Sequence, residues 1–298
     1  MPQLTLDFLS RQATQEAPAP TNGRQRQLTL QLLQPNLTDL TTDLLRLRAE
    51  FDAEIARKAD PAFARYPIGF CLEICKGVLS LVQRELAAPV TPGIRALRQF
   101  IAEGGIAKRV WGDLRGRYFQ NAIQLGGLYV DVANDSVDPS KPKVEILPLP
   151  QSGFTALQDF AQYARLAEVY WQARVYPNRY LPELAPVFPL LLVYQNGRIQ
   201  PHSAYQTMLY QNLLSDFVLA ERVLFEGEWR DRRLPEEDRL RLEQSLRKVQ
   251  PSAADAPVQA VDDATLKEIF RAARASGLRL DAERCQTLLN EAQRVTGA

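Results

Sequence analysis

Apolar residues recur at spacings of three and four along most of this chain, which is the period of one face of an α-helix. The clearest case is the segment 37–55, where the apolar positions are Leu40, Leu44, Leu47, Phe51 and Ile55. In the first half the same spacing predicts further helices over 68–86, 91–101 and 107–123. In the second half it predicts helices over 155–175, 203–225, 235–249, 262–276 and 281–295. Helix is therefore the dominant element that the sequence predicts.

The middle of the chain has the composition of short strands. Polar turn residues flank the segments GLYVDVAND and KPKVEILPLP, whose strand-forming residues are Tyr129, Val130, Val132, Val144 and Ile146. Further on, LLLVYQNGRIQ contains Asn196 and Gly197, a dipeptide typical of a tight hairpin turn. The predicted fold class is α+β, predominantly helical, with a small antiparallel β element in the middle of the chain.

Two segments poor in apolar residues divide the chain. Residues 10–27 are rich in Gln, Thr, Ala and Pro, and they offer too little apolar surface to offset the entropy of ordering them. We therefore predict a flexible N-terminal tail over 1–27, followed by one helix-rich body over 28–249. The segment 250–261 mixes Pro, Ala and Ser and predicts a linker, and a C-terminal helical arm over 262–298 follows it.

Composition and charge narrow the class of protein. The chain of 298 residues has 36 Lys and Arg against 35 Asp and Glu, so no global field favours nucleic acid or an anionic membrane. No stretch approaches the roughly 20 apolar residues that a membrane span requires. The first residues lack the pattern of a secretory signal, and three cysteines cannot all pair within one chain. We expect a cytoplasmic protein.

The most specific short motif is QLTLDF, at the start of the chain. Its residues Gln3, Leu4, Leu6 and Phe8 resemble the peptide by which many bacterial proteins dock on the replicative sliding clamp. The resemblance covers six residues. It implies that the Gln side chain hydrogen-bonds at a pocket rim while the leucines and the aromatic ring fill an apolar groove. An exposed tail suits this role.

The same residues also fit a structural interpretation. Alternating apolar positions at Leu4, Leu6 and Phe8 are typical of an edge strand that pairs with the body. The tetrad QLTL recurs at Gln27–Leu30 without the aromatic residue, and two such strands could pair with each other. Both interpretations stay open at this point.

Basic and aromatic residues alternate in KRVWGDLRGRYFQNAIQ. Within the helix predicted there, Lys108, Arg109, Arg115, Arg117 and Tyr118 could form a patch for nucleic acid or another anion. The alternative is a solvated helix face beside a packed aromatic edge.

The loop DVANDSVD could gather oxygen ligands for a cation. Its candidate ligands are Asp131, Asn134, Asp135 and Asp138, but their spacing matches no metal-binding loop, and Asn with Asp is common in turns. We therefore predict a turn and no metal site.

Residues for nucleophilic catalysis are scarce. His202 is the single histidine, so a Ser or Cys dyad could use only this base, and we expect it to hydrogen-bond locally instead. Cys71 and Cys75 are one helical turn apart on an apolar face and are predicted to be core residues. No catalytic, metal or cofactor motif is recognisable, and we predict no cofactor.

These observations favour a non-catalytic adaptor or accessory protein that binds a protein partner. The sliding clamp and DNA metabolism are the most specific context, because of residues 3–8. One alternative is a metal-independent, transferase-like enzyme with a pocket formed by the acidic loop together with Arg115, Arg117, Tyr118 and Asn121. Another alternative is a nucleic-acid-binding protein that uses the local basic patch.

Overall fold

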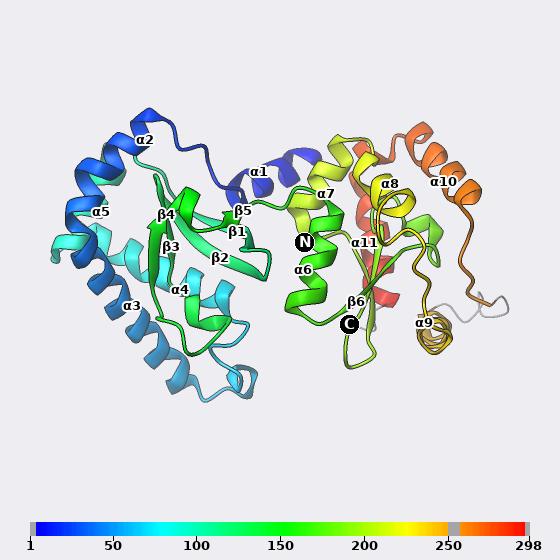
Figure 1. Cartoon of the computed structure of the whole chain (residues 1–298), viewed down its shortest axis with the longest axis horizontal. Coiled ribbons are helices and arrows are strands. Elements are labelled where there is room, and N and C mark those ends of the chain that lie inside the picture. Colours follow the sequence, from blue (N-terminus) through cyan, green and yellow to red (C-terminus); the bar gives the residue numbers. More distant parts are fainter. Residues whose placement is uncertain (1–3, 250–256, 296–298) are drawn as a thin grey trace. The chain divides into compact units, whose positions relative to one another are not determined.

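The computed structural model of the chain describes residues 4–249 and 257–295, which fold into two compact units (Figure 1). One unit, Gln15–Ala156, lies in sequence between two parts of the other, and we call it the inserted unit. The other, called here the split unit, contains the described residues up to Thr14 and those from Leu157 onward. The sequence predicted one body over 28–249. The structure differs because each unit has hydrophobic clusters of its own.

The inserted unit is a layer of helices on an antiparallel sheet. Its helices are α2 (Gly23–Leu28), α3 (Leu37–Lys58), α4 (Cys71–Ala87) and α5 (Pro92–Ala102). Its strands are β1 (Ala107–Leu114), β2 (Tyr118–Leu125), β3 (Leu128–Asp131), β4 (Glu145–Pro148) and β5 (Phe154–Thr155). They lie in the order β4-β3-β2-β1-β5, and each neighbouring pair is antiparallel.

The core of the inserted unit lies between the sheet and helices α3, α4 and α5, as Figure 1 shows. Successive strand residues face opposite sides of a sheet, so Ile123 and Val130, which pair in register, both point to the helices. On the opposite side, a smaller cluster contains Val110, Tyr129 and Phe154. The helices predicted over 37–55, 68–86 and 91–101 are confirmed, as are the strands around Tyr129 and Ile146.

The helix predicted over 107–123 is wrong, because this segment forms the β1–β2 hairpin. Its turn has positive φ at both Arg115 (61°) and Gly116 (66°), a conformation that reverses the chain. The spacing misled because residues four apart, such as Val110 and Leu114, share a face in a helix and also in a strand. The antiparallel pairing of Ala107–Leu114 with Tyr118–Leu125, rather than the spacing of four, identifies the strands.

The split unit combines a small sheet with several helices. Strands β6 (Arg174–Pro177), β7 (Leu190–Val193) and β8 (Ile199–His202) form an antiparallel sheet in that order. The hairpin predicted at Gly197 is confirmed, and Gly197 has a φ of 80°. The helices are α1 (Leu6–Glu16, of which the residues up to Thr14 belong here), α6 (Phe160–Tyr170), α7 (Tyr205–Leu214), α8 (Val218–Phe225), α9 (Glu236–Val249), α10 (Asp263–Ala275) and α11 (Ala282–Val295).

Two predictions about this unit need adjustment. The single helix expected over 203–225 is divided into α7 and α8, because Asp216 and Phe217 adopt positive φ values of 53° and 69°. The predicted C-terminal arm packs into the split unit, where Phe270 is fully buried and Val295 joins the cluster around Leu191. Of the predicted linker, residues 257–261 have no regular structure, and 250–256 lie outside the described residues.

The N-terminal segment also differs from the predicted flexible tail. Helix α1 begins at Leu6, and its positions Leu9 and Ala13, four apart, are both buried. Helix α2 is capped by Asn22, whose side-chain oxygen accepts a hydrogen bond from Gln25 N at 3.0 Å. Short apolar stretches and one good cap are thus enough to order residues 6–16 and 23–28. The edge-strand interpretation is wrong as well, because both QLTL segments run into helices where the structure describes them.

Candidate functional site

The residues of the QLTLDF peptide are partly used by the fold. Leu4 is buried, Leu6 and Phe8 are half-buried, and Gln3 lies outside the described residues. Thr5 Oγ1 accepts a hydrogen bond from Phe8 N at 3.1 Å, which holds the first turn of α1. The part of the peptide from Leu6 onward is therefore helical, whereas capture in a groove as an extended segment would require this turn to open.

The predicted basic patch is divided between the two ends of the β1–β2 hairpin. At one end, Lys108 Nζ donates to Ala17 O at 2.7 Å, and Arg109 contacts Asn121 and Glu16. A strand rises about 3.3 Å per residue, so the turn at the other end is roughly 20 Å away. There Arg115 binds Glu145 at 2.7 Å, Arg117 is exposed, and Lys141 lies over the ring of Tyr118. One continuous patch does not form.

The acidic loop does not gather its carboxylates around one point. Asp131 is fully buried and accepts hydrogen bonds from Gln120 Nε2 at 2.6 Å, Tyr129 OH at 3.0 Å and Ala133 N at 2.8 Å. Its burial raises the pKa of this carboxyl to about 6. Asp138 instead accepts from Ser140. The described residues contain no cluster of three or more His, Cys, Asp or Glu side chains that could hold a metal ion.

The enzyme alternative required the acidic loop and Asn121 to converge. Asn121 points to the helix side of the sheet, where its Nδ2 lies 3.4 Å from Cys71 Sγ. Asp131 points to the opposite side, because it follows Val130, which faces the helices. These two residues are therefore separated by the sheet, and the pocket proposed for that enzyme is not assembled by them.

A buried ion-pair cluster, which the sequence analysis missed, explains the remainder of this loop. Arg48 on α3 is fully buried, and it binds Asp135 at 2.7 and 3.0 Å and Asp52 at 2.7 Å. Asp52 also accepts from Tyr66 and Lys143. We call these five residues the Arg48 cluster. It fixes the acidic loop to α3 and so has a structural role.

His202 forms the local hydrogen bond that the sequence predicted. Its Nδ1 accepts from Ala204 N at 3.0 Å, and Tyr163 OH lies 3.0 Å from the same nitrogen. Burial lowers the pKa of His202 to about 4, so the ring is neutral at pH 7. Cys71 and Cys75 are buried core residues, as predicted, and burial raises the pKa of each thiol. These groups favour neutral, packed forms over nucleophilic ones.

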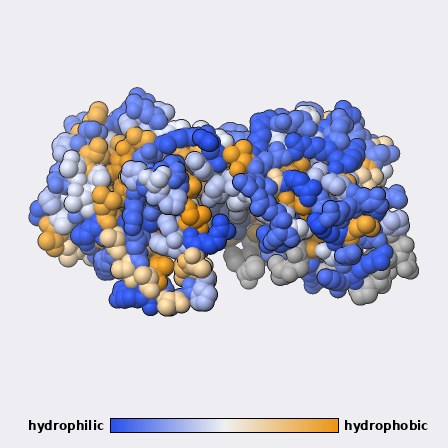
Figure 2. All heavy atoms as spheres, turned by 60° about the horizontal axis from the view of Figure 1, so that its bottom comes forward, coloured by the Kyte–Doolittle hydropathy of each residue, from blue (hydrophilic) through white to orange (hydrophobic). Residues whose placement is uncertain are grey.

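On the face drawn in Figure 2, hydrophilic residues predominate and hydrophobic residues occur in scattered small patches. Among the described residues, no helix combines the length and the apolar character needed to cross a membrane. A hollow lined by apolar side chains that the fold itself holds in place is a candidate docking site.

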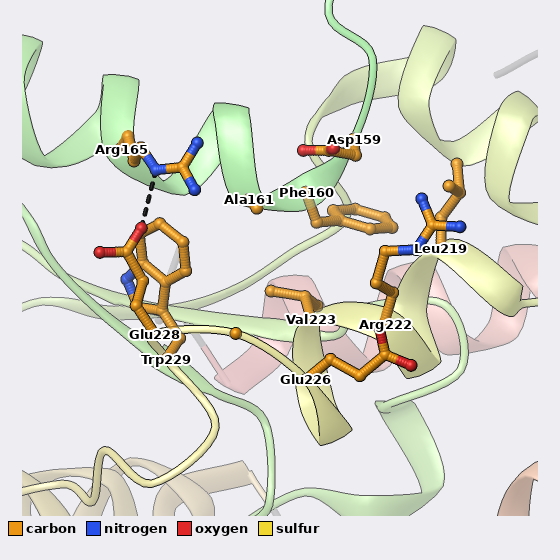
Figure 3. A pocket seen from close by; sticks show the side chains of 11 residues that line it. Asp159, Phe160, Ala161, Arg165, Leu219, Arg222, Val223, Glu226, Glu228 and Trp229 are labelled. Atoms are coloured by element: carbon orange, nitrogen blue, oxygen red, sulfur yellow. Dashed lines mark hydrogen bonds and ion pairs between the residues drawn. The ribbon is translucent and has the colours of Figure 1, made fainter.

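One such hollow lies in the split unit, between α6, α8 and the loop that follows α8 (Figure 3). We call it the α6–α8 pocket. It has a volume of about 220 Å³. Its apolar lining comes from Phe160, Ala161, Leu219, Val223 and Trp229. Figure 3 shows the Phe160 ring above Val223, with the charged side chains of Asp159, Arg222 and Glu226 around these two residues.

The floor of the α6–α8 pocket is rigidly held. Phe160 is fully buried, and Trp229 is 1% exposed. The Trp229 ring has two guanidinium groups over it, those of Arg165 and Arg232, each 5.3 Å from the ring centroid. Asp159 caps α6 by accepting from Gln162 N at 2.7 Å, which fixes the helix end that carries Phe160.

The rim of the α6–α8 pocket is charged. Arg165 Nε donates to Glu228 at 2.7 Å, and this exposed ion pair lies on the same side as Trp229 in Figure 3. Arg222 and Glu226 are exposed residues that complete the lining. An apolar floor within a charged rim is the arrangement found at the centre of protein–protein contacts. The volume suits one large apolar side chain better than a drug-sized molecule, whose pockets measure roughly 300 to 1,000 Å³.

Sequence reasoning missed this pocket because its residues come from two segments that are far apart in the sequence, 159–165 and 219–229. The one available signal was the segment EGEWRDRR, in which a single Trp stands among several arginines. Comparison with known proteins adds no relative: no family model matches the sequence, and no curated protein or solved structure matches it.

Proposed function

We propose that this is a non-catalytic partner-binding protein, whose split unit captures a large apolar side chain of another protein in the α6–α8 pocket. The observation that carries this proposal is a preformed hollow inside a charged rim, in which the half-buried Ala161 and Leu219 offer apolar surface over a buried floor. Burying one large aliphatic or aromatic side chain stabilises a complex by about 1.5 to 3 kcal/mol. Such an anchor is typical of the few residues that dominate the affinity of an interface.

Rigidity of the floor supports the proposal. Trp229 is fixed between the guanidinium groups of Arg165 and Arg232, and Arg232 is itself bound to Glu168 and to Val175 O. A pocket that already has its bound shape loses little conformational entropy when a ligand enters. Most of the free energy gained by burying the anchor therefore contributes to the affinity of the complex, because little of it is lost in ordering the pocket.

The sliding clamp is a second candidate partner, which the N-terminal peptide would bind in the cytoplasm. The observation that favours it is that Leu6 and Phe8 keep part of their surface exposed although α1 is folded. Leu4 is buried, so this candidate requires the first turn of α1 to open. The α6–α8 pocket has no such requirement, and we therefore place it first.

The test is a display library of linear peptides panned against the full chain. Ala161 lines the pocket and is half-buried, so Ala161→Trp fills the pocket without replacing a core residue. We expect the selected peptides to share one large apolar residue and to bind Ala161→Trp at least tenfold more weakly in fluorescence anisotropy.

The matched control is Ala53→Trp, which places the same side chain at an exposed helical position in the inserted unit. This variant should bind the selected peptides as the wild-type protein does. Peptides that bind all three proteins equally, or a library that yields no binder, would contradict the proposed function.

A further inference from the structure

A second hollow of about 570 Å³ lies in the split unit between α8 and α10, and its lining is rich in cationic side chains. We call it the α8–α10 groove. Four cationic residues line it, namely Arg222, Lys267, Arg271 and Arg274, against the two carboxylates of Glu221 and Glu226. The groove therefore has an excess of positive charge, although the whole chain is close to neutral.

The cations of this groove are not equally available to a ligand. Arg274 binds both carboxylate oxygens of Glu221 and also donates to Asp216 O, so it is committed to the fold. Arg271 forms an exposed ion pair with Glu268 at 2.7 Å. Exposed ion pairs contribute little to stability, so a carboxylate of a ligand can replace Glu268 with little loss of free energy. Within the described part of the chain, Arg222 and Lys267 form no ion pair, and both are exposed.

The groove also exposes apolar surface. Val218 keeps 44% of its surface exposed, and Phe225 is half-buried, with Lys267 Nζ 5.5 Å from its ring centroid. Both residues belong to α8. They leave an apolar strip beside the cations, and a ligand that matches the groove needs apolar groups as well as negative charge.

The two hollows share residues. Arg222 on α8 and Glu226 directly after it line both the α6–α8 pocket and the α8–α10 groove. The two hollows therefore adjoin at these two residues, which form a ridge between them. A single extended or helical segment that crosses this ridge can place an anchor in the pocket and its following residues in the groove.

We infer that the partner segment is acidic: a large apolar anchor fills the α6–α8 pocket, and adjoining Asp or Glu residues bind Arg222, Lys267 and Arg271 in the α8–α10 groove. This inference rests on the proposed function and specifies the chemistry of the partner. A protein segment fits better than a nucleic acid because the apolar strip of Val218 and Phe225 beside the cations can contact apolar side chains, which a phosphate backbone does not offer.

The experiment uses the full chain and three labelled peptides built on one anchor selected as described above. In the first peptide the anchor adjoins four Glu residues, in the second four Gln residues and in the third four Lys residues. We expect fluorescence anisotropy at low salt to show the Glu peptide binding about tenfold more tightly than the Gln peptide. The Lys peptide should bind more weakly than both, and added salt should reduce the advantage of the Glu peptide.

Reversing the charge of groove residues tests whether the groove causes the preference for the Glu peptide. The double variant K267E/R271E changes two exposed side chains and should remove the advantage of the Glu peptide while retaining binding of the Gln peptide. The control Lys248→Glu reverses an exposed lysine of α9 that does not line the groove, and it should leave all three affinities unchanged. Thermal unfolding by circular dichroism should be the same for both variants and the wild-type protein.

The outcomes separate the two proposals. Equal affinities for the Glu and Gln peptides, both lost in Ala161→Trp, would overturn the acidic partner and leave the pocket standing. Failure of every peptide to bind would overturn both. A single-stranded oligonucleotide that binds the wild-type protein but not K267E/R271E, without any preference for the Glu peptide, would assign the groove to nucleic acid and overturn the inference.

Discussion

The Arg48 cluster of the inserted unit and the α8–α10 groove of the split unit use charge in opposite ways. Arg48 is fully buried and bound to two carboxylates, whereas Arg222 and Lys267 are exposed beside a hollow. Removing one member of a buried pair leaves a charge without a partner, which destabilises the fold strongly. Exposed charges affect the free energy of unfolding only weakly. Burial, rather than the presence of charge, therefore distinguishes the charged residues that stabilise the fold from those that a ligand can contact.

The largest effect is expected from Arg48→Met, which keeps the length of the aliphatic side chain but removes the guanidinium group. Asp52 and Asp135 would lose their buried partner, and the free energy of unfolding should fall by about 3 to 5 kcal/mol. Urea denaturation followed by circular dichroism measures this change.

The matched control for Arg48→Met is Arg84→Met, which removes an exposed ion pair with Glu50 in the same unit. This control should change the free energy of unfolding by less than about 1 kcal/mol. A similar decrease in the free energy of unfolding for the two variants would contradict the expectation that buried ion pairs affect stability more than exposed ones.

Within the inserted unit, the sequence predicted the long helices but neither the hairpin nor the buried ion pairs. Long periodic segments such as 37–55 were identified because their burial face repeats over several turns. The hairpin over 107–125 was not, because its apolar residues four apart fit a helix as well as a strand. Arg48 could not be recognised as buried, since its partner Asp135 is 87 residues away and only the folded chain brings them together.

The candidate site was still less predictable from the sequence. The residues named in advance, Lys108 through Tyr118, share a short stretch of sequence, but the hairpin separates them. Phe160 and Val223 come from segments that are far apart in the sequence, and the packing of α6 on α8 creates the hollow that they line with Trp229. Local patterns predict elements, whereas this pocket depends on contacts between distant segments.

A second test concerns Asp131, whose folded-state pKa of about 6 is above its ordinary value of 3.8 because the carboxyl is buried. The protonated form is therefore favoured in the folded protein. Its stabilising contribution is complete below pH 4 and is lost as the pH rises through 6, by an amount on the order of 3 kcal/mol.

Asp131→Asn should remove this loss, because an amide does not titrate. The side chain of Gln120 can turn to place its unpaired Oε1 against the new amide nitrogen. The measurement is urea denaturation of both proteins at several values between pH 4 and 7. In the same loop, the control Asp138→Asn changes a half-buried carboxylate and should retain the wild-type decrease. A wild-type protein whose stability follows that of Asp131→Asn at every pH would show that Asp131 does not titrate in this range.

A smaller effect of opposite sign is expected in the split unit. The pKa of His202 is lowered to about 4 from 6.5, so the folded protein holds the neutral ring while the unfolded chain takes up a proton below pH 6.5. The stability that His202 contributes is therefore present above pH 6.5 and is lost as the pH falls toward 4. The ring keeps some exposure to solvent, so we expect less than for Asp131.

His202→Asn is the matching variant, because its Oδ1 can accept the hydrogen bond from Ala204 N that Nδ1 accepts now. The difference in the free energy of unfolding between wild type and variant should favour the variant increasingly as the pH falls from 7 to 4. A constant difference across this range would mean that the ring titrates alike in the folded and unfolded chains.

The smallest effect concerns α1, where the split unit uses for its own fold the residues that resemble a clamp-binding peptide. Because Leu4 is buried and Leu6 begins a helix, the full chain should bind a sliding clamp about tenfold more weakly than a synthetic peptide of residues 1–10. Arg11→Pro interrupts α1 and should raise the affinity of the full chain toward that of the peptide. The control Arg11→Ala removes the same exposed ion pair with Asp7 but keeps the helix, so it should not. Equal binding by the full chain and the peptide would mean that α1 opens freely, and failure of the peptide itself to bind would end the clamp hypothesis.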